Sequence, residues 1–252
     1  MVNLFTAVFY QPILNLVVAI YNILPGHDIG WTIIILTVVI KAILYPLSKK
    51  AIEGQKSLQN LQPKLEEIKK KHANDKEASS RAMMELYKQE KVSPLSSCLP
   101  LLIQLPFFWA IFKVFRDELM GKSLVMIYPF IFNPGTLNPL AFGFVDFSKP
   151  NIILAFLAGI SQYFQAKMMP MRPAVAKGDG AKDENMMAMM NKQMLYFMPA
   201  LTIFICLTLP SGLAFYWLIS TLLTIAQQCW IFRKLKDPNS TDPKVIEGEI
   251  IK

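Results

Sequence analysis

The chain has 252 residues and a net charge of +8, with 53% hydrophobic and only 17% charged residues. Soluble domains carry about 25% charged residues, so this composition excludes an ordinary soluble domain and indicates a membrane protein. The three cysteines lie in apolar runs without metal-ligand spacing, and we interpret them as small hydrophobic side chains.

The N-terminal segment, residues 1–28, is predicted to be an amphipathic helix that lies in the membrane interface. Gln11, Asn15 and Asn22 share one helical face, whereas apolar residues cover the opposite face. Pro12 disfavours a spanning helix, and a sixth span is the alternative. The segment has no basic stretch followed by a small-residue cleavage site, so we do not expect a cleavable signal peptide.

Five later segments are apolar and long enough to cross a bilayer, which takes about 20 residues. Only Pro210, Ser211 and Gly212 separate the last two, and these are typical turn residues, so the two spans are predicted to form a tight hairpin. The predicted transmembrane helices cover residues 29–47, 94–117, 151–170, 193–209 and 212–232.

The distribution of positive charge sets the predicted orientation, because loops rich in Lys and Arg stay in the cytoplasm. Residues 48–93 contain eleven Lys and Arg, whereas residues 116–150 contain three. We therefore expect the N-terminus and the external segment 118–150 to lie outside and the C-terminus to lie inside. The predicted cytoplasmic parts are residues 48–93, 171–192 and 233–252.

Residues 48–93 have a pattern of their own that predicts a cytoplasmic helical hairpin. Asn74 and Asp75 can end one helix and cap a second. Such a hairpin is either a solvated spacer or a docking or lid element at the membrane surface. The predicted fold class is thus an all-α membrane protein with five transmembrane helices, an N-terminal interfacial helix and this hairpin. The apolar residues of its first helix repeat at spacings of three and four, and they are Leu58, Leu61, Leu65 and Ile68.

The apolar run from Ile33 to Leu47 contains a single charge, Lys41. A charge at such depth costs about 2.5–3.5 kcal/mol on insertion scales. Lys41 lies about 9 Å from the end of the predicted helix, so its side chain could extend to the lipid headgroups. Other spans, however, carry polar residues at a similar depth. These are Gln104, Gln162, Gln165, Ser220, Thr224 and Gln227.

These polar residues allow two interpretations. They form interhelical hydrogen bonds of a kind common in helix bundles, or they line a water-filled cavity that opens towards the cytoplasm. In the second case Lys41 would attract the carboxylates of an acidic polypeptide that lodges there before it crosses. Burial of the polypeptide's own hydrophobic segment would then drive the transfer without a covalent step.

Other chemistry has little support in the sequence. No P-loop, HExxH or nucleophile elbow occurs, and His27 and His72 are isolated. The apolar cores of the spans contain no Asp or Glu, which ion-coupled transporters usually need. We therefore expect no enzyme, cofactor or metal site. A small-solute channel or uncoupled transporter is the alternative function, and a structural assembly factor is a third.

Several long motifs resemble the YidC/Oxa/Alb family of membrane protein insertases. They are "YPLSKK", "LQPKLEEIKKK", "MMELYKQEKVSPLSSCLPLLIQLPFFWAIF" and "LPSGLAFYWLISTLLTIAQQ", and the likeness runs from about Phe5 to Phe232. The resemblance implies a five-span bundle with an outer interfacial helix and a cytoplasmic helical hairpin. It also implies a protein that inserts small membrane proteins and helps them fold, alone or beside the Sec translocon.

The resemblance further implies a set of site residues. A hydrophilic substrate-binding groove would be lined by Lys41, Gln104, Gln165, Trp217, Ser220 and Thr224. A hydrophobic slide on the outer faces of two spans would consist of Phe156, Ile160, Phe164, Leu218 and Leu222. The family's groove cation is usually arginine, whereas lysine provides a point charge without the planar fork.

The implied partners are nascent membrane proteins, the Sec translocon, the lipid bilayer and, through the basic cytoplasmic loops, the ribosome, without direct reading of nucleic acid. The implied location is the bacterial cytoplasmic membrane. Two features depart from many relatives. We expect no large periplasmic domain of the kind that many relatives carry, and because five basic and four acidic residues occur from Arg233 onward, we do not expect ribosome binding through the tail.

Overall fold

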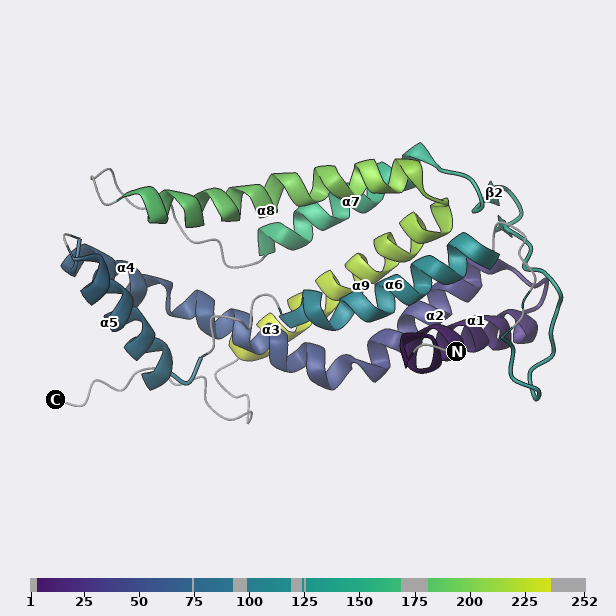
Figure 1. Ribbon diagram of the computed structural model, residues 1–252, viewed down its shortest axis with the longest axis horizontal. Coiled ribbons are helices and arrows are strands. Elements are labelled where there is room, and N and C mark those ends of the chain that lie inside the picture. Colours follow the sequence, from purple (N-terminus) through teal and green to yellow (C-terminus); the bar gives the residue numbers. More distant parts are fainter. Residues whose placement is uncertain are drawn as a thin grey trace.

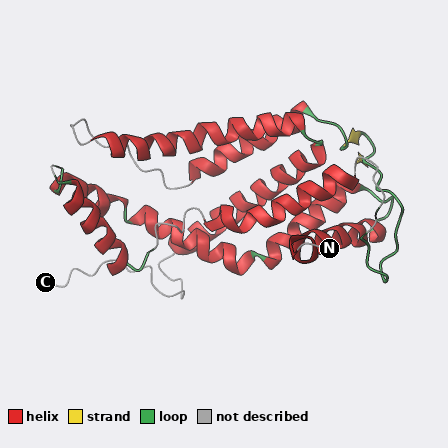
Figure 2. Ribbon diagram, in the orientation of Figure 1, coloured by secondary structure: helices red, strands yellow, loops and turns green. Residues whose placement is uncertain are grey.

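Most of the described residues lie in helices, and most of these helices run along the longest axis of the molecule (Figure 1). The computed structural model describes residues 4–73, 75–92, 99–118, 124, 126–168 and 181–236. Figure 2 shows how short the two strands are beside the helices. In chain order the elements are η1 (a π-helix, Thr6–Tyr10), α1 (Gln11–Ile23), α2 (Ile29–Ile43), α3 (Tyr45–Asn60), α4 (Gln62–Lys71), α5 (Lys76–Gln89), α6 (Leu99–Glu118), β1 (Leu140–Ala141), β2 (Val145–Asp146), α7 (Ile152–Met168), α8 (Ala181–Thr208) and α9 (Ser211–Lys236).

The two ends of the molecule differ in structure. Helices α4 and α5 lie at one end, which we call the hairpin end, and strands β1 and β2 lie at the opposite end, which we call the β end (Figure 1). The strands pair antiparallel, with Leu140 opposite Asp146 and Ala141 opposite Val145. The predicted helical class is confirmed, and this small ribbon is an addition that the sequence did not predict.

Apolar helical stretches support the predicted membrane class. Within the described residues, two are long and apolar enough to cross a membrane by length and composition alone, Thr6–Ile23 and Ser211–Lys234. The bent pair Ile29–Ile43 and Tyr45–Asn60 adds a third if it forms one span. Shorter apolar helices are Ile152–Met168 and Leu195–Thr208. The count of five spans stays a prediction.

A sharp break separates α2 from α3. The sequence placed the end of this helix at Leu47, but α2 ends at Ile43, and α3 begins at Tyr45 with a bend of 69°. Pro46 stands in the first turn of α3, where the missing N–H of proline leaves no helical hydrogen bond unmade. Lys41 consequently lies in the last turn of α2.

Two helices in the C-terminal half are longer than predicted. Helix α8 begins at Ala181, inside the predicted loop 171–192, and α9 continues to Lys236, beyond the predicted end at residue 232. The start of α8 is rich in Ala and Met, which are good helix formers. The remainder of the predicted loop, residues 169–180, and the tail from residue 237 lie outside the described residues.

Helix α7 packs closely on α8 and also contacts α9. Gly159 permits the close approach to α8, because a Cβ atom there would collide with the side chain of Ile203 and lie 3.1 Å from the Pro199 carbonyl oxygen. Ala155 and Ala158 on the same helix are fully buried. Small side chains therefore set the distance between α7 and its neighbours.

The predicted hairpin region, residues 48–93, contains most of α3 together with α4 and α5, and the last two pack on each other. An ion pair of 2.7 Å joins Lys64 to Glu90 across the two helices. Asp75 caps α5 by accepting a hydrogen bond of 2.9 Å from the Ala78 N–H, whereas Asn74 lies outside the described residues. The apolar stripe predicted from the sequence is largely buried here, in a cluster formed by Leu58, Leu61, Leu65 and Tyr87.

The polar face of α1 contacts protein. Asn15 is 2% exposed, and its side chain donates to the Met126 carbonyl at 2.9 Å and accepts from the Tyr128 N–H at 2.6 Å. Asn22 donates to the Phe132 carbonyl at 2.6 Å. These partners belong to residues 124–150, which we call the α6–α7 segment. The polar stripe thus holds this segment in place, so the stripe no longer favours an interfacial helix over a span.

Asn15→Ala should loosen the α6–α7 segment, because the Met126 carbonyl and the Tyr128 N–H lose their partner in two partly buried hydrogen bonds. We expect the free energy of unfolding to fall by about 2–4 kcal/mol, measured as a lower melting temperature in detergent. Asn22→Ala removes a more exposed hydrogen bond and should cost less. A melting temperature of Asn15→Ala equal to that of the wild type would contradict this role.

Candidate functional site

Helix α9 is the element that the other long helices share. It packs against α2, α3, α6, α7 and α8, and Figure 1 shows it running between them. Tyr216, Ser220 and Thr224 recur at every fourth residue of α9 and therefore point to the same side. We call these three residues the α9 polar ladder. Each of its two ends binds a side chain from a different helix.

Thr224, the end of the ladder nearer the C-terminus, binds Lys41. The Lys41 ammonium on α2 donates to the Thr224 hydroxyl oxygen at 2.9 Å, and that hydroxyl donates to the Ser220 carbonyl at 2.8 Å. The lysine predicted from the sequence is therefore fixed on α9, and its side chain is directed into the bundle. The structure thus shows Lys41 hydrogen-bonded to α9, whereas the alternative drawn from the sequence has its side chain extend towards the headgroups.

Lys41 keeps most of its binding capacity. An ammonium group has three donors, and one of them is used by Thr224. Among the residues that the structure describes, no Asp or Glu forms an ion pair with Lys41. The site thus carries a positive charge with donors left for a ligand or for water, and an anionic ligand is the type it suits.

Tyr216, the other end of the ladder, binds Gln104. The Gln104 amide on α6 donates to the Tyr216 hydroxyl at 2.6 Å. Tyr216 is 2% exposed. It lies eight residues from Thr224, which is about 12 Å along the helix. Gln104 and Lys41 are therefore tied to one ladder at two separate levels.

Trp217 lies next to the ladder where α6, α7 and α9 meet. Its ring makes an edge contact with Phe108 of α6, with 4.9 Å between ring centroids. It also packs on the small buried residues of α7, α8 and α9, which are Ala155, Ala158, Cys206 and Ala214. The indole is only partly buried.

The two glutamines of α7 behave differently from each other. Gln162 accepts a short hydrogen bond from the Thr202 hydroxyl of α8, so it joins two helices. Gln165 is partly buried and has no hydrogen bond to any of the described residues. The two glutamines thus fit different interpretations of the sequence. Gln162 forms an interhelical hydrogen bond, whereas the amide of Gln165 is available to water or a ligand, as the cavity interpretation requires.

Two further polar side chains of α9 are buried without partners. The Gln227 amide nitrogen and the Gln228 carbonyl oxygen are inaccessible, and neither has a hydrogen-bond partner among the described residues. They follow Thr224 by three and four residues, so they lie one turn further towards the hairpin end. Buried polar atoms in proteins usually bind protein groups or ordered water.

An apolar surface runs along α7 and α9. Phe156, Ile160 and Phe164 follow one another at every fourth residue of α7 and are 48%, 49% and 56% exposed. Leu222 of α9 is 47% exposed, whereas Leu218 is partly buried against the small residues beside Trp217. Four of the five predicted slide residues therefore present half of their side chains at the surface.

The sequence interpretation missed two members of this site, Tyr216 and Thr202. Tyr216 precedes Ser220 by four residues, and that spacing puts it on the same helical face as Ser220 and Thr224. Thr202 was hidden by an apolar run, and nothing in the sequence paired it with Gln162.

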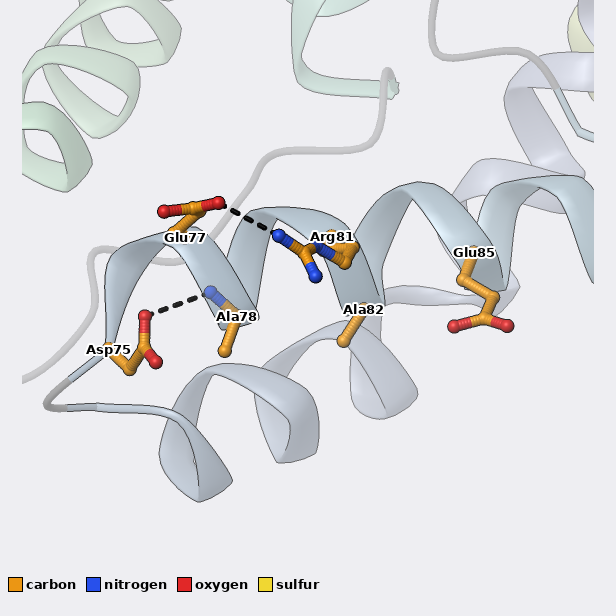
Figure 3. Close-up of a pocket in the computed structure, with 6 residues that line it drawn as sticks. All are labelled: Asp75, Glu77, Ala78, Arg81, Ala82 and Glu85. Atoms are coloured by element: carbon orange, nitrogen blue, oxygen red, sulfur yellow. Dashed lines mark hydrogen bonds and ion pairs between the residues drawn. The ribbon is translucent and has the colours of Figure 1, made fainter.

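A surface hollow of about 340 Å³ lies on α5, away from the ladder (Figure 3). One helix supplies its whole lining, including the Asp75 cap and an exposed Glu77–Arg81 ion pair of 2.8 Å. A hollow between side chains of one helix does not enclose a ligand, so we do not assign a site to it. Within the described residues, no group of three or more His, Cys, Asp or Glu could hold a metal ion.

Comparison with known proteins supplies the family. The family model described as "60Kd inner membrane protein" matches residues 19–238, which is most of the chain. The chain belongs to this family. The match confirms the family resemblance drawn from the sequence motifs, and it includes Lys41, all of α9 and the α4–α5 pair.

Relatives with the name "Membrane protein insertase YidC" cover most of the chain. The protein of Fusobacterium nucleatum is 36% identical over 207 residues, which are 82% of this chain and 87% of that protein. The proteins of Geotalea daltonii and Haemophilus influenzae are 35% and 38% identical over 83% and 82% of this chain. This chain spans only 34% of the length of each of these two relatives.

Tyr216→Phe should destabilise the helix bundle of this protein, because the Gln104 amide loses its hydrogen-bond acceptor. We expect a loss of about 1–2 kcal/mol in the free energy of unfolding, measured by thermal melting in detergent. Tyr163→Phe is the matched control, since no hydrogen bond of its hydroxyl is found among the described residues.

A double-mutant cycle with Gln104→Leu separates the contact from other effects. The two substitutions together should cost less than the sum of the single ones, because the bond is already lost in either single variant. Additive costs would show that Gln104 and Tyr216 do not interact in the membrane protein.

Proposed function

We propose that this protein is a membrane protein insertase and membrane chaperone. The observation that carries the proposal is the Lys41 ammonium, fixed to Thr224 inside the bundle and without an acidic partner among the described residues. An unpaired cation in an apolar surrounding is costly, and an incoming carboxylate offsets that cost. The names of the relatives support the same function.

The proposed groove contains the ladder and the side chains around it. It opens to the cytoplasm and to the lipid, and Lys41, Gln104, Gln165, Trp217, Ser220 and Thr224 line it. Support comes from the partly buried amide of Gln165 and from the orphaned Gln227 and Gln228 atoms. Such atoms need water or a polar ligand, and water around the ammonium lowers its desolvation cost.

The hairpin end faces the cytoplasm in this proposal. Eleven Lys and Arg fall between residues 48 and 93, which include α3, α4 and α5, whereas residues 124–150 at the β end contain Lys149 alone. Positive segments stay inside. The N-terminus then lies outside and the C-terminus inside a bacterial cytoplasmic membrane.

Transfer follows from burial and charge. The acidic tail of a nascent membrane protein binds at Lys41, and its hydrophobic segment meets the exposed slide formed by Phe156, Ile160 and Phe164. Burial of that segment in lipid supplies about 25 cal/mol per Å² of apolar surface. The membrane potential pulls negative charge outwards with about 2.3 kcal/mol per charge per 100 mV. No covalent step is required.

The α4–α5 pair serves as the docking element for partners at the membrane surface. Its buried cluster makes it a stable helix pair, and its basic stretch Lys69–Lys71 lies on the last turn of α4. Nascent chains, the Sec translocon and the ribosome are the proposed partners. The insertase works alone or with the translocon.

The charge of Lys41 can be tested with purified protein in liposomes. Lys41→Glu should abolish insertion of a short membrane protein with an acidic tail, and Lys41→Ala should slow it about tenfold or more, because electrostatic attraction is lost. Lys41→Arg should insert normally. Protease protection of the inserted tail is the measurement.

A substrate with a neutral tail is the control, and Lys41→Ala should affect it less. Normal insertion of the acidic-tailed substrate by Lys41→Ala would remove the charge from the mechanism. Flux of small solutes without insertion would instead favour the channel or uncoupled transporter.

Deletion of Gln59–Lys88 should cripple insertion while the remaining helices stay in the membrane. Arg81→Ala is the control, because it removes only an exposed ion pair that contributes little. Insertion assays and protease mapping of the spans are measured together. A deletion variant that still inserts at the normal rate would show that α4 and α5 are a spacer.

A further inference from the structure

The tip of the β1–β2 ribbon holds a phenylalanine in an unfavourable backbone conformation. Phe142 has φ of 55° and Gly143 has φ of 79°, so both central residues of the turn are left-handed. Turns of this kind favour Asn, Asp and Gly, and a bulky residue at positive φ is strained. Contacts of the Phe142 side chain must therefore compensate for the strain.

The tip is clamped onto the first turn of α2. The Phe142 N–H donates to Asp28 Oδ2 at 2.5 Å, while Asp28 Oδ1 caps α2 by accepting from the Gly30 and Trp31 N–H groups at 2.7 and 3.1 Å. The phenyl ring lies directly over Gly30, where an added Cβ would be 2.5 Å from ring atom Cζ. Gly30 thus leaves the space that this ring occupies.

The ring of Phe142 also joins α2 to α9. Its centroid lies 5.8 Å from the ring of Trp31 on α2, 5.7 Å from that of Phe215 on α9 and 6.4 Å from that of Phe147. Phe147 is 1% exposed, and its carbonyl accepts from the Gly212 N–H at the start of α9. Phe142 therefore fills the junction of both helices at the β end.

These are the same two helices that hold Lys41 and Thr224 further along. Gly30 precedes Lys41 by eleven residues, which is about 16 Å of helix. Most of the buried side chains in between are apolar, namely Ile33, Leu36, Ile40 and Leu213, and the hydroxyls of the buried Thr32 and Thr37 donate to backbone carbonyls of the preceding turn. The α2–α9 pair thus carries a charge at the Lys41 level and is mostly apolar from there to the β end, apart from hydroxyl groups such as those of Tyr216 and Ser220.

We propose that the Phe142 ring, clamped by Asp28 and seated over Gly30, is a seal that closes the β end of the α2–α9 pair to water and ions. The inference rests on the proposed function in one respect: a hydrated groove open on one side needs a barrier on the other. Hydrophobic constrictions exclude ions because water leaves them. The seal is supplied by the tip of a ribbon between two helices.

A turn residue without sealing function would respond differently to substitution. Phe142→Asn places a residue that tolerates positive φ in the turn and removes the apolar ring. If Phe142 only shapes the turn, the Phe142→Asn variant should leak protons no faster than the wild type. If Phe142 is a seal, the variant should leak faster.

The test measures ion leak in substrate-free liposomes that contain the full chain, with a trapped pH-sensitive dye and a potassium gradient. We expect Phe142→Asn to raise proton leak severalfold. Gly30→Ala should do the same, because its Cβ displaces the ring while Phe142 is retained. Phe130→Asn is the matched control: this side chain is 82% exposed on the same segment and should leave the leak unchanged.

The melting temperature in detergent is measured for each variant to confirm that it folds. If Phe142→Asn does not fold, the proton leak of Gly30→Ala tests the seal instead. If Phe142→Asn and Gly30→Ala both fold and leak protons no faster than the wild type, the seal is overturned. The insertion assay is run separately. If the wild type fails to insert substrate but Phe142→Asn raises the proton leak, the insertase is rejected and the seal is kept. If the wild type inserts substrate but both variants leak no more than the wild type, the seal alone is rejected.

Discussion

An ammonium group in the last turn of an apolar helix needs a polar partner, and the arrangement of this bundle depends on the partner that Lys41 has. The 2.9 Å bond to Thr224 fixes α2 on α9 at one level, and the bond of Gln104 to Tyr216 fixes α6 on α9 at another. Because α9 also packs on α7 and α8, one helix connects the elements that carry the polar side chains of the site. The charge is held in place by the neutral hydroxyl group of Thr224, so it is not cancelled.

The same helix pair is built differently towards its two ends. Around Lys41 the side chains are polar and partly buried, and buried amide atoms lack partners among the described residues. Towards the β end the pair is mostly apolar, and Phe142 and Phe147 of the α6–α7 segment pack there. An ammonium group can be hydrated from one end of a helix pair and shielded from water at the other end only if polar and apolar side chains are separated along the helices in this way.

Local patterns in the sequence predicted the helices, the Asp75 cap and the polar face of α9, because each depends on neighbours a few residues away. The sequence could not predict what covers a polar face. The stripe on α1 read as water-facing, yet Asn15 binds the backbone at Met126, 111 residues later. Tyr216 was missed for the same reason, since its partner Gln104 lies on another helix. The break before Pro46 was misplaced by one turn because apolar residues continue through it.

The bend between α2 and α3 has a mechanical consequence. Helix α3 is an unbroken rod of 16 residues, about 24 Å long, that leaves the bend and ends where the α4–α5 pair begins. Its contacts with α9 include the ring of Tyr45 beside that of Trp230, with 6.4 Å between centroids. Lys41 lies three residues before Leu44, where the two helices meet. The rod thus separates the α4–α5 pair by about 24 Å from the turn that carries the ammonium and connects the two through one continuous helix.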